Sequence, residues 1–476
     1  MFICRFLHLT NGFQYDELYS IATATPSVSW SVIWHEMLLR DVNLPLFNML
    51  FYGWNHIFPI TPVYAHLFSA LLGAAAVIAG AWLAPKSWPK LKTFIFTMLM
   101  SGSLILVVYG TNVRSYSLSV LLSTCFTLLA LRLIAHFEQK QKISIKTWIW
   151  FFLLGFLGSY SHYFCAAAFF IAALVVFLYA CYYRQGRIWS FCGTALVFFL
   201  WLPWVWHALG LMGGVVPGEA GTLDFWYQTP FALATWGVLT FLFGSPWILN
   251  VLLIFGVLAS VSLLATYGKK IFKYADFILP LAQIALLCVV LSVVGMRFNL
   301  WMDRYFLPFL PSIFILLAAS LYHLYERHHL FIVLLPILLF GWMSKYWNTD
   351  YIYTREYTGL KDTFTYLMRP DGPEKVLVDR RSMGYSAKAL DVMLAYYVPK
   401  DAKLQLITLT DENMSLIWTS EPKIPVLIML CSQVKLLDAI TKMHISEDPV
   451  AFGRDTCVVI GESANEPVQK DKQRKK

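Results

Sequence analysis

The sequence predicts an α-helical protein that crosses a membrane many times and ends in a small α/β module. Of the 476 residues, 58% are hydrophobic and 14% are charged, whereas soluble domains carry about 25% charged residues. Apolar runs long enough to cross a bilayer recur up to residue 346, and beyond it they shrink to strand length. Aromatic residues reach 17%, as is typical of chains with many membrane–water interfaces.

Ten apolar stretches are predicted to span the bilayer. They cover about residues 63–83, 93–109, 115–134, 147–162, 164–182, 188–206, 246–267, 277–296, 305–324 and 330–346. Two further stretches, 44–60 and 230–244, are too short or too interrupted to span comfortably. The first of them suits a helix that lies along the membrane interface.

Basic residues are concentrated in every second loop. These loops hold 13 Lys and Arg residues, against four in the alternate set, namely Arg40, Arg114, Arg297 and Arg304. Loops rich in Lys and Arg face the cytoplasm, so the alternate set is predicted to face outward. An even number of spans then places both the N-terminal segment and the C-terminal module on the outer face. Because the net charge of +9 arises from these loops, it does not indicate a nucleic-acid partner.

The change in composition predicts two domains. Residues 1–346 form a transmembrane domain, and residues 347–476 form an extracytoplasmic α/β module that ends in a basic, disordered tail. Within the module we expect a helix at Ala387–Tyr397 and strands at Val376–Asp379, Leu404–Leu409, Val426–Leu430 and Cys457–Ile460.

Asp16 and Glu17 form an acidic pair in the first outer segment. Two adjacent carboxylates at a membrane surface are commonly a solvated loop charge. A carboxylate that faces a cavity of low dielectric beside a cation can instead act as a general base. Composition alone favours the first interpretation.

Three other outer-face positions have unusual surroundings. Arg114 lies near a helix end, where an arginine either snorkels to the interface or binds a phosphate through its planar guanidinium. Arg304 begins a span that carries Pro308 and Pro311, and these prolines interrupt the backbone hydrogen bonds near the outer face. His162 lies among aromatic residues, a setting typical of a hydrogen-bonded interface histidine.

Taken in this order, the outer-face residues resemble the GT-C superfamily of polytopic glycosyltransferases. The similarity is to the branch of protein O-mannosyltransferases and lipid A aminoarabinose transferases, and it covers about residues 15–325. It rests on Asp16-Glu17, Leu44-Pro45-Leu46-Phe47, Arg114-x-Tyr116, His162-Tyr163, Leu202-Pro203-Trp204 and Arg304-Tyr305-x-x-Pro308-x-x-Pro311.

The resemblance implies an enzyme of the plasma (inner) membrane, a hexosyl- or pentosyltransferase that works on the outer face. Its donor would be a sugar linked to a polyprenyl phosphate, and its acceptor a hydroxyl of a glycan, lipid or protein. The eight cysteines lack the spacing of a metal site, and no cluster of carboxylates requires a metal. The resemblance leaves open whether the enzyme needs a divalent metal, because some relatives use one and others do not.

The resemblance also implies roles for particular residues. Asp16 matches the position of the catalytic base, and Glu17 would support or orient it. The cations for the donor phosphate would be Arg114, Arg304 and Arg297, and the substrate cavity would be lined by Tyr116, His162, Tyr163 and Tyr305.

One feature departs from the family pattern. The family places a complete span before the acidic pair, whereas only 15 residues precede Asp16 here. A helix of that length reaches about 22 Å, against a hydrocarbon core of about 30 Å. We expect either that the chain as written starts too late or that this form lacks its first helix, which leaves the acidic loop poorly anchored.

Two other classes of protein fit a polytopic chain. A transporter or flippase of lipid-linked sugars is the main alternative, although transporters place charged groups near the bilayer midplane. Here Asp276 and Asp303 lie at the ends of spans. The third class is an assembly protein whose C-terminal module binds a partner.

Overall fold

The computed structural model divides into two compact units. The described residues are 9, 13, 15–213, 274–295, 303–347, 360–379, 392, 396–398, 402–409, 423–428, 443–445, 450–452 and 456–463. The helical unit comprises Met1–Asn11, Thr23–Gly214 and Trp226–Ile352, and the sheet unit comprises Gly12–Ala22, Val215–Phe225 and Tyr353–Lys476. The segment Gly12–Ala22 thus groups with the C-terminal part, while the domains 1–346 and 347–476 stay a prediction.

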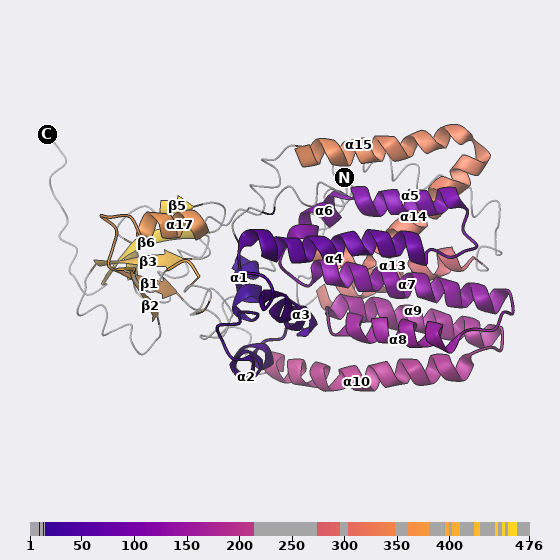
Figure 1. Ribbon diagram of the computed structural model, residues 1–476, viewed down its shortest axis with the longest axis horizontal. Coiled ribbons are helices and arrows are strands. Elements are labelled where there is room, and N and C mark those ends of the chain that lie inside the picture. Colours follow the sequence, from indigo (N-terminus) through magenta and orange to yellow (C-terminus); the bar gives the residue numbers. More distant parts are fainter. Residues whose placement is uncertain are drawn as a thin grey trace. The chain divides into compact units, whose positions relative to one another are not determined.

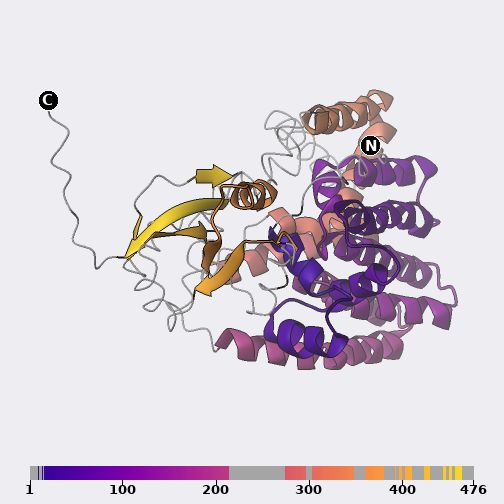
Figure 2. The same cartoon turned by 60° about the vertical axis from the view of Figure 1, so that its left-hand side comes forward.

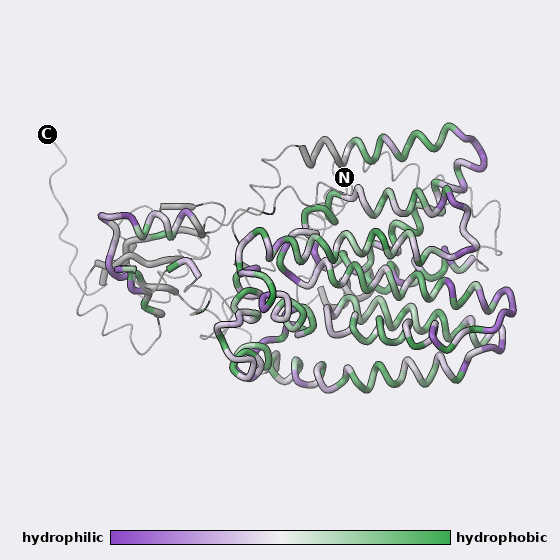
Figure 3. The backbone as a smooth tube through the Cα atoms, in the orientation of Figure 1, coloured by the Kyte–Doolittle hydropathy of each residue, from purple (hydrophilic) through white to green (hydrophobic). Residues whose placement is uncertain are grey.

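The helical unit consists of long helices that run side by side (Figure 1). Its described elements are α2 (Trp30–Val32), η2 (Ile33–Met37), η3 (Leu38–Arg40), α3 (Leu46–Asn55), α4 (Pro62–Leu83), α5 (Lys90–Gly102), α6 (Leu104–Thr111), α7 (Tyr116–Glu138), α8 (Ile145–Ser159), α9 (Tyr163–Tyr182), α10 (Arg187–Gly213), α13 (Ala275–Gly295), η6 (Asp303–Phe309), α14 (Leu310–Arg327), η7 (His329–Val333) and α15 (Leu334–Trp347). Figure 3 shows apolar residues along most of their length and hydrophilic residues mainly near their ends.

Within the described residues, five helices are long and apolar enough to cross a membrane. They are Pro62–Leu83, Tyr116–Glu138, Tyr163–Tyr182, Arg187–Leu211 and Arg304–Arg327. The expected spans at 147–162, 277–296 and 330–346 appear as shorter apolar helices, and the one at 246–267 lies outside the described residues. A membrane protein with several spans is thus supported, and the number ten stays a prediction.

The expected span at 93–109 is bent rather than straight. Helices α5 and α6 meet at an angle of 52°, and Ser103 between them has extended backbone dihedrals. A Gly–Ser pair is a known cause of sharp kinks in helices, and Gly102-Ser103 is such a pair. Taken together, the two helices make a sixth candidate span.

Helix α7 is enclosed by its neighbours, and α10 is not. α7 contacts α4, α8 and α9, and most of its residues, including several Ser and Thr residues, are buried, as expected for a helix within a bundle. On α10, large apolar side chains such as Ile188, Phe199 and Trp206 are exposed. This outward face is typical of a helix in contact with lipid.

The sheet unit includes helices α1 (Tyr15–Ala22) and α17 (Leu360–Leu367). Helix α17 and the mixed sheet can be followed in Figure 2 by their orange and yellow colours. Its strands are β1 (Lys375–Asp379), β2 (Gln405–Leu409), β3 (Lys423–Ile428), β4 (Met443–Ile445), β5 (Val450–Phe452) and β6 (Thr456–Ser463). They lie in the order β2-β1-β3-β6-β4, with β5 paired to β6. β1 is parallel to β2 and β3, and β6 is antiparallel to its three neighbours.

The sheet unit has its own apolar core. Phe364 and Leu367 on α17, Val376 on β1 and Val458 on β6 are each at most 4% exposed. The four expected strands correspond to β1, β2, β3 and β6. The expected helix at Ala387–Tyr397 lies largely outside the described residues, and the extracytoplasmic location of the unit stays a prediction.

Candidate active site

The turn between α8 and α9 is fixed against α7 by buried polar contacts. The hydroxyls of Ser119 on α7 and Ser161 in the turn lie 3.2 Å apart. Ser161 also donates to the carbonyl of Gly158, and the Cys165 thiol lies 3.6 Å from the carbonyl of Ser119. Small residues at such contacts let helix backbones approach closely. The beginning of α9 is therefore held beside the beginning of α7.

His162 caps the N-terminus of α9. Its Nδ1 accepts a hydrogen bond of 3.2 Å from the backbone N–H of Phe164, and so satisfies one of the donors that a helix start leaves unpaired. This bond leaves Nε2 to carry the proton of the neutral ring. The cap thereby fixes both the orientation and the tautomer of His162.

Aromatic rings from three elements meet at His162. Its ring centroid lies 6.3 Å from that of Tyr116 at the start of α7 and 6.0 Å from that of Tyr305 in η6. Tyr305 is stacked on Phe164 of α9, with centroids 5.2 Å apart and an angle of 16° between the planes. The structure therefore brings together three of the four residues that were expected to line a cavity.

Two arginines place positive charge around this histidine. Burial, together with the nearby charges of Arg114 and Arg304, lowers the pKa of His162 to about 3. The Arg304 guanidinium also lies 5.7 Å from the centroid of the Tyr305 ring. His162 is consequently neutral near pH 7, and the site concentrates two cations at one end of the helical unit.

The local backbone of η6 explains how Arg304 reaches this site. Asp303–Phe309 forms a 3₁₀ helix that contains Pro308, and Pro311 stands in the first turn of α14. Proline lacks the N–H that a continuing α-helix needs. The prolines thus coincide with a change from 3₁₀ to α-helical hydrogen bonding after Arg304, and η6 contacts α7 and α9.

Tyr163, the fourth expected cavity residue, is directed elsewhere. Its hydroxyl donates a 2.5 Å hydrogen bond to the carbonyl of Val42, and its ring lies 6.4 Å from that of Trp201 on α10. The N–H of Leu46 in turn donates to the carbonyl of Tyr160. These bonds fasten the segment before α3 to the α8–α9 turn, which indicates a packing role for Tyr163.

The Leu202-Pro203-Trp204 motif also serves packing. Pro203 lies inside α10, and the buried ring of Trp204 contacts the rings of Trp34, Tyr160 and His207. The expected interface helix at 44–60 corresponds to α3, which begins after Pro45.

The acidic pair lies in the first turn of α1, within the sheet unit. Glu17 is 2% exposed, whereas Asp16 is half-buried. Acidic residues in a first turn interact favourably with the helix dipole. Arg297 lies outside the described residues.

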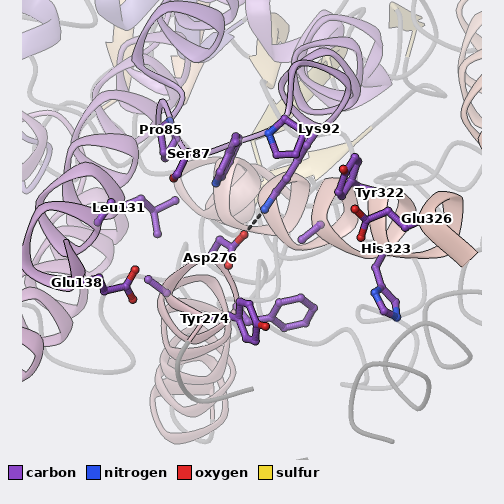
Figure 4. A pocket seen from close by; sticks show the side chains of 16 residues that line it. Pro85, Ser87, Lys92, Leu131, Glu138, Tyr274, Asp276, Tyr322, His323 and Glu326 are labelled. Carbon is purple, nitrogen blue, oxygen red and sulfur yellow. Dashed lines mark hydrogen bonds and ion pairs between the residues drawn. The ribbon is translucent and has the colours of Figure 1, made fainter. Parts of the chain in front are cut away.

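The described residues of the helical unit line a narrow cavity and a larger one. The narrow one of about 10 Å³ lies beside Tyr116 and is lined also by Gly73, Tyr109 and Leu307, which is room for about one water molecule. The larger one of about 340 Å³ lies at the other end of α7, where Glu138 lines it (Figure 4). There Lys92 of α5 is paired with Asp276 of α13 and lies 4.4 Å from the Trp88 ring centroid.

The sequence offered only a weak signal for that ion pair. Lys92 and Asp276 are 184 positions apart, and Lys92 is only one of several lysines that precede its apolar run. The pair links two helices that are far apart in the chain, which is a sufficient structural reason for its presence.

Comparisons with known proteins identify the class of fold. No protein-family model matches the chain, and no curated protein is found as a relative. Among solved structures, ArnT from Cupriavidus metallidurans in the apo state aligns with a TM-score of 0.55 at 12% identity, over 96% of each chain. The same protein bound to undecaprenyl phosphate gives 0.55 at 10% identity, again over 96% of each chain.

The fold is therefore that of a helical, polytopic GT-C protein. ArnT is a lipid A aminoarabinose transferase of this class, so the similarity expected from the outer-face residues is confirmed at the level of the fold. At these identities the likeness concerns the fold alone, and activity has to be argued from the site.

Proposed function

We propose that the chain is a membrane glycosyltransferase that moves a sugar from a polyprenyl-phosphate carrier to an acceptor hydroxyl. The observation that carries this proposal is the pair of arginines, Arg114 and Arg304, around a neutral His162. The fold supports it, because the ArnT structure that aligns over 96% of the chain contains undecaprenyl phosphate.

The charges suit a phosphate leaving group. During transfer the bond between the anomeric carbon and the phosphate oxygen breaks, and that oxygen leaves with the electron pair. The carrier phosphate thereby gains about one negative charge. Two guanidinium groups stabilise this developing charge more strongly than the charge of the intact donor, and such differential stabilisation accelerates a reaction. A neutral His162 can add an Nε2–H donor to an oxygen of the phosphate.

The acceptor hydroxyl needs a base as its oxygen bonds to the anomeric carbon. We assign this role to Asp16, which takes the hydroxyl proton, and we assign to Glu17 the orientation of its neighbour. Arg297 is a third candidate cation for the phosphate. We place this reaction on the outer face of the plasma membrane. The sugar is a hexose or pentose, and the acceptor is a glycan, lipid or protein.

The arginines provide the test. Wild-type protein and the variants Arg114→Ala and Arg304→Ala are reconstituted in liposomes with a radiolabelled polyprenyl-phosphate sugar and a candidate acceptor. We expect each variant to lose about 10²- to 10³-fold in the rate of transfer, as when one charge-stabilising donor is removed. Arg187→Ala, at an exposed position at the start of α10, is the matched control and should retain full activity. Undiminished transfer in both site variants would overturn the proposal.

One observation favours the alternative of a lipid-linked-sugar transporter. Transporters commonly contain broken helices near the bilayer midplane, and the pair α5 and α6 is bent by 52°. The residues at this bend, Gly102 and Ser103, are uncharged, whereas transporters place ionisable groups there. Movement of a fluorescent lipid-linked sugar across the liposome membrane, without transfer to any acceptor, would favour this alternative.

A further inference from the structure

The residues just before the acidic helix contact two consecutive tyrosines of the C-terminal part. The rings of Phe13 and Tyr396 meet edge to face, with centroids 5.2 Å apart and an interplanar angle of 67°. The hydroxyl of Tyr397 donates a 3.4 Å hydrogen bond to the carbonyl of Phe13. Phe13 is only 3% exposed. These contacts join positions 384 residues apart in the chain.

The charge of Glu17 acts on the same tyrosine, Tyr397. Burial raises the pKa of Tyr397, and the charges of Tyr396 and Glu17 raise it further. The Tyr397 hydroxyl therefore stays protonated and remains a hydrogen-bond donor at neutral pH. Tyr397 thus interacts with a charge in the first turn of α1 and contacts Phe13, which precedes that helix.

The two tyrosines are themselves held by the sheet unit. The ring of Tyr397 is stacked on that of Phe364 in α17, with centroids 5.2 Å apart and planes within 9°. Tyr396 and Tyr397 meet edge to face at 5.1 Å. Helix α17 in turn packs beside β5 and β6. A continuous chain of contacts therefore leads from the sheet to the N-terminal helix.

Helix α1 needs such support. It has eight residues, and helices shorter than about 12 residues are marginal in water unless tertiary contacts hold them. Aromatic pairs in offset or edge-to-face geometry contribute more than the burial of their area alone. The contacts of Phe13 supply this kind of support at the N-terminal side of α1.

We propose that Tyr396 and Tyr397 are positioning residues that hold the Asp16–Glu17 helix in its active place, so that the C-terminal part is a working component of the transferase. The proposal rests on the proposed function in that Asp16 is the base. It assigns no contact between the two tyrosines and the substrate. Loss of the tyrosine contacts should therefore slow the chemical step and leave donor binding intact.

Hydrogen exchange tests the support directly. In the full-length protein, Tyr396→Ala, Tyr397→Ala and Phe13→Ala should each accelerate amide exchange over residues 15–22 by about 2- to 10-fold, the range that corresponds to one aromatic pair. Tyr396→Phe keeps the ring contact and should exchange like wild type. The matched control is Tyr366→Ala, because the Tyr366 ring contacts Arg369 of the same unit.

Kinetics test the consequence. The three alanine variants should lower kcat by about 2- to 10-fold with an unchanged KM for the donor, and Tyr396→Phe should restore wild-type kcat. The double variant Phe13→Ala/Tyr396→Ala should lose no more than the larger of the two single losses, because both remove the same contact. Equal kcat values and equal exchange in Tyr366→Ala, Tyr396→Ala and Tyr397→Ala would overturn the proposal.

The two proposals fail in different ways. A wild-type protein without transferase activity would contradict the proposed function, while the exchange comparison would still decide whether the tyrosines hold α1. Active wild-type protein, with unchanged exchange over residues 15–22 in all three alanine variants, would contradict the positioning role alone.

Discussion

The ring of Phe169 on α9 occupies the place where a side chain at position 155 on α8 would stand. A Cβ atom added to Gly155 would overlap the Phe169 ring. That ring is fully buried and is held on its other sides by Phe126 of α7 and Phe151 of α8, at 5.6 and 5.4 Å between centroids. The close approach of α8 and α9 therefore depends on glycine at position 155.

Gly155→Ala should destabilise the protein by about 1–3 kcal/mol, the usual cost of overpacking a filled core. The buried ring cannot move aside without disturbing α7 and α8. Thermal unfolding of the detergent-solubilised protein measures the effect as a lowered Tm. Gly210→Ala on α10 is the control, because nothing lies within 4 Å of an added Cβ there. Equal Tm values for the two variants would show that α8 and α9 do not need their close approach.

His162 should make stability depend on pH under acidic conditions. Its pKa is lowered from 6.5 to about 3 in the folded protein, so the unfolded chain binds the extra proton first. Stability from this group is fully present above about pH 6.5 and is lost as the pH falls towards 3. His162→Asn keeps a side chain that can cap α9 and should lose less stability between pH 7 and pH 4.5, measured as the difference in Tm. The exposed His56 provides the comparison variant, His56→Asn, which should behave as wild type does.

The ion pair between Lys92 and Asp276 should matter for stability and not for catalysis. Asp276→Asn leaves the Lys92 ammonium, whose side chain is 6% exposed, without its charged partner. We expect a loss of about 3 kcal/mol, the low end for breaking a buried pair, because the Asp276 side chain keeps 22% exposure. Replacing both residues, as Lys92→Met/Asp276→Asn, should recover most of this loss in denaturant unfolding. Transfer per folded molecule should be unchanged in both variants, since the pair lies at the far end of α7 from His162.

The class of fold could be predicted from the sequence, because the length of an apolar stretch and the basic residues that flank it can be read from local sequence. The sequence also indicated Arg114 and Arg304, whose role in binding the donor phosphate stays a prediction. Arg114 and Arg304 stood out because they lie in the set of loops that holds few basic residues. The prolines after Arg304 indicated an irregular helix start, which is the 3₁₀ helix η6. The kink between α5 and α6 had a visible signal as well, the Gly102-Ser103 pair, which apolar length alone conceals.

The directions of side chains and the contacts between distant residues could not be predicted from the sequence. His162 and Tyr163 are neighbours in a motif, yet His162 is the extended cap residue and Tyr163 is the first residue of α9. The ring of His162 therefore meets that of Tyr116, whereas the Tyr163 hydroxyl binds the carbonyl of Val42. The contact of Phe13 with Tyr396 and Tyr397 crosses 384 positions and leaves no local pattern. The sequence led us to expect that the segment of Asp16 and Glu17 is poorly anchored. The contact of Phe13 with the two tyrosines supplies an anchor for it other than a preceding span.

Asp16→Asn should abolish sugar transfer with little effect on the fold. A positioned general base contributes about 10²- to 10⁴-fold to the rate, and asparagine cannot accept the proton. The stability cost should be small, at most about 1 kcal/mol, because the change removes one favourable charge from the first turn of α1. The measurement is the initial rate of transfer in liposomes, with membrane insertion checked by protease protection. Glu17→Gln should give a smaller loss, since Glu17 is assigned to orientation. If the rate of transfer in Asp16→Asn equals that of wild type, the base is another residue. If neither wild type nor Asp16→Asn transfers sugar but both still move the lipid-linked sugar across the membrane, the chain is a transporter.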